Sequence, residues 1–312
     1  MRNFKRYIPI LSSLFLVVNL FFYVKNLKEK SSVEPKVVQN IGSFHRESHC
    51  GKQPNFLTKL HIKAPVAIDL SQQRYKGLAF LHGKALSKVL HLKTWEQFDY
   101  FSSYALTPTG NMFLTPMPYI SVKEQTFEFQ KNIYKLHSNS GKLEVWLHLD
   151  EVHPSSNNPY GIIALTYDCD DNSLWISSLD ETDYTHNRGV IYHVDVASKK
   201  ILQRVEGVDA LSLKLIKSEK GKFLLAGMAR ENSLNAYAIV EQEMKQTPLT
   251  LFNIGESTCR IRKISVIGKN QLKLKTIPFS YSLIAQTQEG NIRKTYTVLW
   301  DSSQLLWDVT GE

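Results

Sequence analysis

The segment Ile163-Ala-Leu-Thr-Tyr-Asp-Cys-Asp-Asp-Asn-Ser-Leu-Trp-Ile-Ser177 decides the fold class. Residues that favour β-strands lie on both sides of a polar turn centred on Asn172, which is the pattern of a β-hairpin. Hairpins of the same form recur at 104–114, 211–225 and 264–274. Their turn centres are residues that tolerate positive φ, as a tight hairpin requires: Gly110, Gly221 and Asn270.

A second hairpin follows each of these, and its first strand carries a tyrosine. These tyrosines recur at intervals of 58, 45 and 59 residues, at Tyr134, Tyr192, Tyr237 and Tyr296. Four strands in each unit of about 50 residues is typical of propeller blades. A fifth, degenerate unit lies at 66–92. We therefore predict an all-β fold, a β-propeller of five to six four-stranded blades, in which a sixth blade would combine strands from both chain ends. A β-sandwich, or two small β-domains, is the alternative.

The N-terminus predicts a membrane tether. Residues 7–24 form an uncharged, mostly apolar run of 18 residues, preceded by Arg2, Lys5 and Arg6. This length suffices for one spanning helix, and the preceding cations favour a cytoplasmic N-terminus. We predict an N-terminal signal anchor over 1–30, a linker over 31–58 and an exported propeller domain over 59–312, in the periplasm or outside the cell. A cleaved signal peptide is the alternative.

Charge and cysteines narrow the function classes. The net charge is +9, but residues 1–30 contribute +5 of it, so no basic patch typical of nucleic-acid binding is apparent and no nucleic-acid partner is predicted. Cys50, Cys169 and Cys259 form no CxxC motif, which argues against a zinc ribbon or a thioredoxin-like redox pair. We expect three single cysteines, with one disulfide as the alternative.

The phrases Leu106-Thr-Pro-Thr-Gly110 and Val194-Asp-Val-Ala-Ser-Lys-Lys-Ile201 resemble hairpin turns of the six-bladed propellers of the gluconolactonase, strictosidine synthase and NHL-repeat group. The resemblance spans roughly residues 60–309 and implies six blades. For the gluconolactonases it also implies Glu, Asn and Asp side chains around a divalent cation in the channel, which activate water or a lactone carbonyl. No inner-strand Glu of this sequence aligns with that role, and Arg and Tyr occupy several of the expected positions.

Ligand sites of a propeller usually lie at one mouth of its central channel, where the loops before each inner strand meet those between the second and third strands. Asp209 and Arg230 are expected at this mouth, where they would clamp an anionic or carbonyl-bearing ligand or form an ion pair at the rim. In the polar loop 178–189, Asp180 and Asp183 could offer oxygen ligands to calcium. The remaining candidates are an aromatic wall and one cation of the polar loop: Tyr104, Tyr119, Tyr160 and Arg188.

The sequence contains no GxSxG, HExxH or Walker motif. We therefore interpret the chain as a membrane-tethered module that binds a protein or a small ligand and is not evidently catalytic. One alternative is a divalent-metal lactonase or esterase that uses acids of 178–189 together with Asp209. The other is a scaffold subunit of a cell-envelope complex. No cofactor is predicted, with calcium or another divalent cation as the alternative.

Overall fold

The computed structural model of the chain describes residues 40–45, 50–70, 75–118, 127–255, 258–281 and 293–311. The predicted signal anchor and Tyr119 lie outside the described residues. No helix within the described ranges is both long and apolar enough to cross a bilayer.

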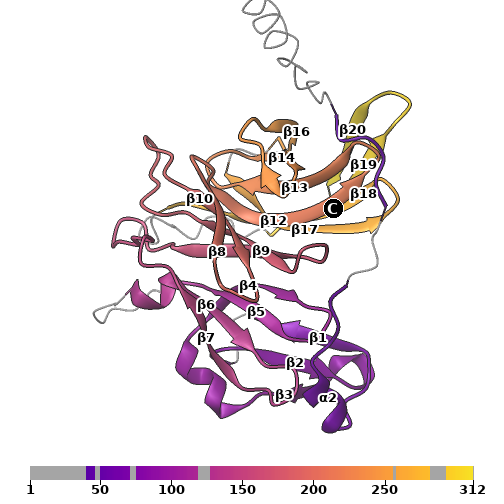
Figure 1. Cartoon of the computed structure of the whole chain (residues 1–312). Coiled ribbons are helices and arrows are strands. Elements are labelled where there is room, and N and C mark those ends of the chain that lie inside the picture. The colour runs from indigo at the N-terminus through magenta and orange to yellow at the C-terminus, as the bar shows by residue number, and fades with distance from the viewer. Residues whose placement is uncertain are drawn as a thin grey trace, which may run out of the picture. The chain divides into compact units, whose positions relative to one another are not determined.

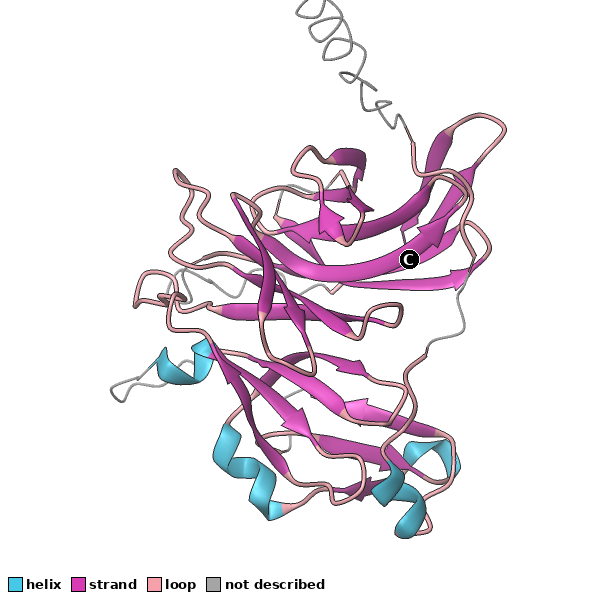
Figure 2. Ribbon diagram, in the orientation of Figure 1, coloured by secondary structure: helices cyan, strands magenta, loops and turns pink. Residues whose placement is uncertain are grey.

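Strands dominate the structure, and the few helical segments are short (Figure 2). The strands form five antiparallel sheets that follow one another along the chain (Figure 1). The first sheet has three strands, β1 (Val66–Asp69), β2 (Ala79–His82) and β3 (Lys88–Leu90). The helical segments are α2 (Asn55–Lys59), η1 (Lys84–Leu86), η2 (Lys93–Phe98) and η3 (Phe127–Lys131).

The other sheets have the strand order expected of propeller blades. The second contains β4 (Phe101–Leu106), β5 (Met112–Pro116), β6 (Asn132–Leu136) and β7 (Leu143–His148). The third contains β8 (Ile162–Asp168), β9 (Ser173–Ser178), β10 (Val190–Asp195) and β11 (Ile201–Glu206). The fourth contains β12 (Ala210–Ser218), β13 (Gly221–Met228) and β14 (Ser233–Val240), whose outer edge pairs with β15 (Glu243–Met244) and β16 (Leu249–Asn253). The fifth contains β17 (Cys259–Gly268), β18 (Gln271–Pro278), β19 (Thr295–Asp301) and β20 (Leu306–Gly311).

The first strands of successive sheets lie beside one another, β4 against β8, β8 against β12 and β12 against β17. This arrangement confirms the predicted β-propeller, with five sheets in the described part of the chain. The C-terminal strand β20 forms the outer edge of the fifth sheet, and no described sheet combines strands from both chain ends.

The repeated features of the sequence occupy equivalent places in the sheets. The hairpin-turn residues Asn172 and Asn270 have φ of 56° and 55°, and Gly110 and Gly221 also have positive φ, as predicted. Each recurrent tyrosine is buried on the third strand of its sheet and pairs with an apolar residue of the second strand: Leu114 with Tyr134, Ile176 with Tyr192, Leu224 with Tyr237 and Leu274 with Tyr296. The periodic sequence therefore fixes which side chains fill the core between blades.

A register irregularity also recurs, because the first strand of each of the second to fifth sheets carries one extra residue near its start. The extra residues are Ser102, Ile163, Leu211 and Arg262. Such a β-bulge leaves a backbone carbonyl outside the ladder and available to another partner. Ile163 O, for example, accepts hydrogen bonds from Ser102 Oγ and Thr115 Oγ1 of the preceding blade, both at 2.9 Å.

The segment comprising residues 40–45 and 50–54, here called the N-terminal strap, packs against turns of several blades. Phe44 is buried, pairs with Ser218 of the fourth blade and accepts a hydrogen bond from Asn270 N of the fifth at 2.8 Å. Further along, Lys52 N donates to Thr107 O of the second blade at 2.9 Å. The strap therefore contacts blades that are far apart in the sequence.

The strap is also joined covalently to the third blade, because Cys50 forms a disulfide with Cys169 in the turn between β8 and β9. The expectation of three single cysteines is wrong for this pair. Their separation of 119 residues gives no local signal, and only the path of the strap brings them together. The remaining thiol, Cys259, is buried.

Candidate functional site

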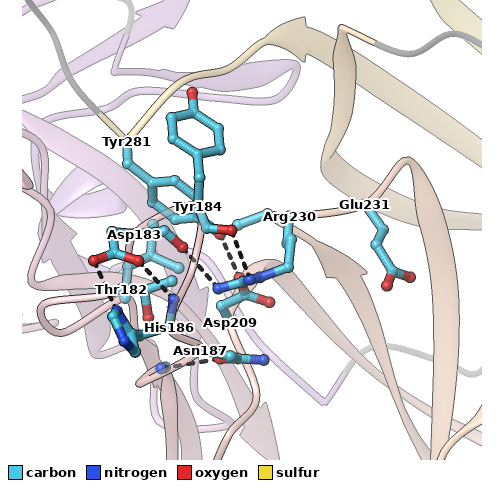
Figure 3. A network of polar contacts seen from close by, with 12 residues as sticks. Thr182, Asp183, Tyr184, His186, Asn187, Asp209, Arg230, Glu231 and Tyr281 are labelled. Carbon is cyan, nitrogen blue, oxygen red and sulfur yellow. Dashed lines mark hydrogen bonds and ion pairs between the residues drawn. The ribbon is translucent and has the colours of Figure 1, made fainter.

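Three side chains from two neighbouring blades meet at the predicted channel mouth (Figure 3). Asp209 and Arg230 belong to the fourth blade and Tyr281 to the fifth, and we call these three residues the mouth cluster. The Tyr281 hydroxyl donates a hydrogen bond to Asp209 Oδ2, and Arg230 Nε lies 3.7 Å from the same oxygen. Arg230 also donates to the carbonyls of Asp183 at 2.7 Å and Tyr184 at 3.1 Å. The structure thus brings together the predicted pair Asp209 and Arg230, and adds Tyr281.

The local backbone explains why Asp209 and Arg230 meet. They lie directly before β12 and shortly after β13, and Ala229 N donates to Asp209 O at 2.7 Å. Gly189 packs so closely that an added Cβ would lie 2.4 Å from Asp209 Cα. Arg260 donates to the carbonyls of Ala229 and Arg230 at 2.8 and 3.0 Å, which fixes the loop that carries Arg230.

Burial dominates the electrostatics of the mouth cluster. It raises the pKa of Asp209, although the Tyr281 hydrogen bond and the Arg230 charge act in the opposite direction. Burial and the Asp209 charge together raise the pKa of Tyr281, so its hydroxyl remains a hydrogen-bond donor at neutral pH. Asp209 Oδ1 has no hydrogen-bond partner among the described residues. The cluster therefore acts mainly as a buried link between three blades.

An aromatic row extends from this cluster. Tyr184 is 67% exposed, and its ring packs edge-on against Tyr281 with centroids 5.3 Å apart. Tyr281 contacts Phe279, which contacts Tyr160, with centroid distances of 5.3 and 5.1 Å. Of the predicted aromatic wall, Tyr160 is in this row, whereas Tyr104 lies on β4 and lines the central cavity.

Sequence reasoning missed three members of the row, Tyr184, Phe279 and Tyr281. Tyr184 lies in the polar loop 178–189, and Phe279 and Tyr281 directly follow the second strand of the fifth blade, where loops of the mouth were expected. Their position in those loops, together with their aromatic character, was a usable signal.

The predicted metal residues take part in hydrogen bonds of their own loops. Asp183 Oδ1 accepts hydrogen bonds from Thr185 Oγ1 at 2.7 Å and from His186 N at 2.6 Å, and these bonds lower its pKa. Asp180 accepts from His153 N at 2.6 Å, while burial raises its pKa. Within the part of the chain that the structure describes, no group of three or more His, Cys, Asp or Glu residues is placed to hold a metal ion. A calcium site here stays a prediction.

Arg188, the remaining predicted ligand contact, pairs with Glu181 at 2.6 Å on the exposed surface of the same loop. Such an exposed pair contributes little to stability and leaves the guanidinium accessible to water. Its part in ligand binding stays a prediction.

A second candidate site is the central cavity, with a volume of about 920 Å³. The first strands of all five sheets contribute to its lining, and the strap contributes His45, Cys50 and Gly51. The strap therefore borders the cavity. Because the first strands line it, this cavity is the central channel of the propeller.

Arg262 connects three blades across this channel. It is the extra residue of β17, and its guanidinium donates to Leu211 O at 3.0 Å and to Ser102 O at 3.2 Å, with a further bond to Ser102 Oγ. Leu211 and Ser102 are the bulge residues of two other blades. All three bonds end on neutral oxygens, and no carboxylate of the described residues pairs with Arg262. Burial lowers the pKa of Arg262 to about 10, which still leaves it charged at neutral pH.

No protein-family model and no curated protein matches the chain. Among solved structures, it is similar to a hypothetical selenium-binding protein from Sulfolobus tokodaii, with 9% identity, a TM-score of 0.49 and coverage of 87% of this chain and 79% of that one. It is also similar to U3-55K, with 8% identity, a TM-score of 0.44 and coverage of 80% and 82%. A protein of unknown function from Bacteroides caccae gives 9% identity, a TM-score of 0.41 and coverage of 77% and 85%.

These similarities are distant, and no function is transferred from them. The strand order of the five sheets establishes the propeller fold. Membership of the gluconolactonase, strictosidine synthase and NHL-repeat group stays a prediction.

Proposed function

We propose that this protein is a non-catalytic binding module that holds a small ligand in the central channel of its propeller. The observation that carries the proposal is the cavity of about 920 Å³. Its volume lies within the range of roughly 300–1,000 Å³ that is typical of sites for small molecules. Its lining combines apolar strand residues with hydroxyl and charged groups, as a site that orients a ligand requires.

Within the mouth cluster, Tyr281 is not poised for acid–base catalysis. Asp209 and Tyr281 hydrogen-bond to each other, and both are buried. Acid–base catalysis needs a group within reach of the substrate with a pKa close to the working pH. Tyr281 does not meet that requirement, because its pKa is raised above the ordinary value for tyrosine.

We further propose that the propeller is exported and tethered by the N-terminal segment. The apolar run at 7–24 and the cations before it support the tether. The disulfide between Cys50 and Cys169 supports export, since disulfides persist mainly in oxidising compartments.

A channel-filling variant tests the binding function in the full-length protein in detergent. Ser265 lines the channel on β17, so Ser265→Trp would occupy part of its volume. Gln304→Trp, in the exposed turn between β19 and β20, adds the same side chain away from the channel. Thermal unfolding of all three proteins would be measured with a panel of anionic, neutral and cationic metabolites.

We expect at least one compound to raise the Tm of the wild type and of Gln304→Trp in a saturable manner, and to leave Ser265→Trp unchanged. Stabilisation that persists in Ser265→Trp would place the ligand outside the channel. A panel without any saturable effect on the wild type would contradict the proposed function.

A further inference from the structure

The central channel has a strongly unbalanced charge. Its described lining contains eight Lys or Arg side chains and two carboxylates, Asp168 and Asp170. Both carboxylates are already engaged, because Lys222 pairs with each of them and Lys217 lies 2.6 Å from Asp170. The other cations of the described lining are Lys214, Arg262, Lys263, Lys275, Arg293 and Lys294, so cations outnumber carboxylates there.

Three of these cations, Arg262, Lys263 and Lys275, lie within the first two strands of the fifth blade. Lys263 on β17 and Lys275 on β18 are direct register partners, and both line the channel. Like charges placed directly opposite each other in a sheet are destabilising. Arg262 is the neighbour of Lys263 in the chain and reaches into the same channel. The sheet thus holds three positive charges together at one wall.

The surroundings strengthen the mutual repulsion of these cations. Burial lowers the pKa of Lys263, and the charges of Lys275 and Arg262 lower it further. Lys263 is nevertheless accessible to water, because the channel reaches it. A bound anion would face several cations at close range.

We infer that the channel binds a small anion with two or more oxyanion charges, in the form of carboxylate or phosphate groups, and that Arg262, Lys263 and Lys275 form its site. This inference rests on the proposed function, since it names the ligand class of the same channel. The Arg262 guanidinium is held by its bonds to Leu211 and Ser102 and contributes a fixed positive charge, and the two lysines add ammonium donors for carboxylate or phosphate oxygens beside it.

The test uses full-length protein in detergent, with sodium citrate and sodium pyrophosphate as probes. Trimethyl citrate serves as the neutral analogue and spermidine as the cationic one. Ionic strength is held constant with NaCl, so that general screening does not differ between samples. Thermal unfolding and isothermal titration calorimetry would be measured for the wild type, Lys263→Gln, Lys275→Gln and the control Lys200→Gln, whose side chain is exposed and outside the channel lining.

Citrate or pyrophosphate is expected to bind saturably, and each of Lys263→Gln and Lys275→Gln should weaken that binding roughly tenfold. Lys200→Gln should bind as the wild type does. Without anion, the two channel variants should unfold at the same temperature as the wild type or higher, because each relieves the repulsion between the paired lysines. A purely structural role of these lysines would leave anion affinity unchanged. Binding of citrate alone assigns carboxylates, and binding of pyrophosphate alone assigns phosphates.

If neither probe binds above the NaCl control, or if the lysine variants bind as tightly as the wild type, the anion site is wrong. The proposed function would survive that result if a neutral or cationic compound still binds in a manner that Ser265→Trp abolishes. It would fail as well if Ser265→Trp alters the binding of no compound. The two failures are therefore distinguishable.

Discussion

Two charged residues, Asp209 and Arg262, show how single side chains organise the inner strands. Asp209 is fully buried and accepts a hydrogen bond from the hydroxyl of Tyr281, which belongs to another blade. Arg262 donates to bulge carbonyls of two other blades. In each case a polar group that would be costly to bury alone finds partners on separate strands. The two residues therefore help to hold the blades together around the channel.

The raised pKa of Asp209 predicts a pH dependence of stability. A carboxyl whose folded pKa is raised binds more protons in the folded state, so its contribution to stability is complete below the unfolded pKa of about 3.9 and is lost as the pH rises through the folded pKa. Asparagine cannot titrate. The unfolding free energy of the wild type minus that of Asp209→Asn should therefore fall as the pH rises above about 4.

Denaturant unfolding of both proteins at a series of pH values measures this difference. The interpretation fails if the difference stays constant or grows with pH. Asp308→Asn, at an exposed position on β20, is the control for removing a carboxylate, and its difference from the wild type should not show this fall.

At the level of elements, the inner strands of the second to fifth blades share a β-bulge near the start of each strand. Bulge carbonyls accept hydrogen bonds from hydroxyls of the preceding blade, as Ile163 O does from Thr115 Oγ1. Related bonds run from Ser177 Oγ to Ala210 O and from Ser212 Oγ to Ile261 O, the latter at 2.7 Å. Neighbouring blades are therefore linked by short polar side chains as well as by apolar packing.

Gly189 lies against the backbone of Val208 and Asp209, so we predict that Gly189→Ala strongly destabilises the fold. The new Cβ would lie 2.4 Å from Asp209 Cα and 2.6 Å from Val208 O, which are backbone atoms that cannot move independently. We expect a loss of at least about 2 kcal/mol in unfolding free energy. Denaturant unfolding followed by tryptophan fluorescence measures this loss.

Gly268→Ala is the matched control for Gly189→Ala. There the nearest contact is Gln271 Oε1 at 3.2 Å, at the end of a flexible side chain, and the backbone φ is not positive. A change below about 1 kcal/mol is expected for this control. Equal losses in the two variants would refute the steric explanation.

For the whole molecule, the N-terminal strap has the widest reach. Phe44 contacts the fourth and fifth blades, Cys50 is bonded to the third and Lys52 to the second. A segment that joins blades distant in the sequence restricts the unfolded chain when it is cross-linked. The disulfide therefore fixes the strap against the blades that it contacts.

Replacement of both cysteines, Cys50→Ser with Cys169→Ser, should lower the unfolding free energy by about 2–4 kcal/mol. The physical reason is the long loop that the bond closes, because the two cysteines have a sequence separation of 119. Denaturant unfolding with and without reductant measures the effect. Reductant should destabilise the wild type to a similar extent and leave the double variant unchanged. A wild type indifferent to reductant would argue against the bond.

The sequence by itself determined the local elements of this protein. Alternation of side chains predicted the strands, the turn residues Asn172 and Asn270 predicted tight hairpins, and the recurrent tyrosines predicted equivalent places in the core. These features depend on neighbours within a few residues, so one segment contains the whole signal. Propeller architecture followed from their repetition. The meeting of Asp209 and Arg230 was also predicted, because both were assigned to loops at one mouth.

Only the tertiary structure decided which distant residues meet. The disulfide of Cys50 and Cys169, the contact of Tyr281 with Asp209 and the bonds of Arg262 all join segments far apart in the chain. The excess of positive charge in the channel was likewise decided only by the tertiary structure, since Lys214, Lys263 and Lys275 look like ordinary strand residues in the sequence. Their place in the channel lining depends on which way each strand faces once the blades surround the channel, and that orientation is set by packing between blades.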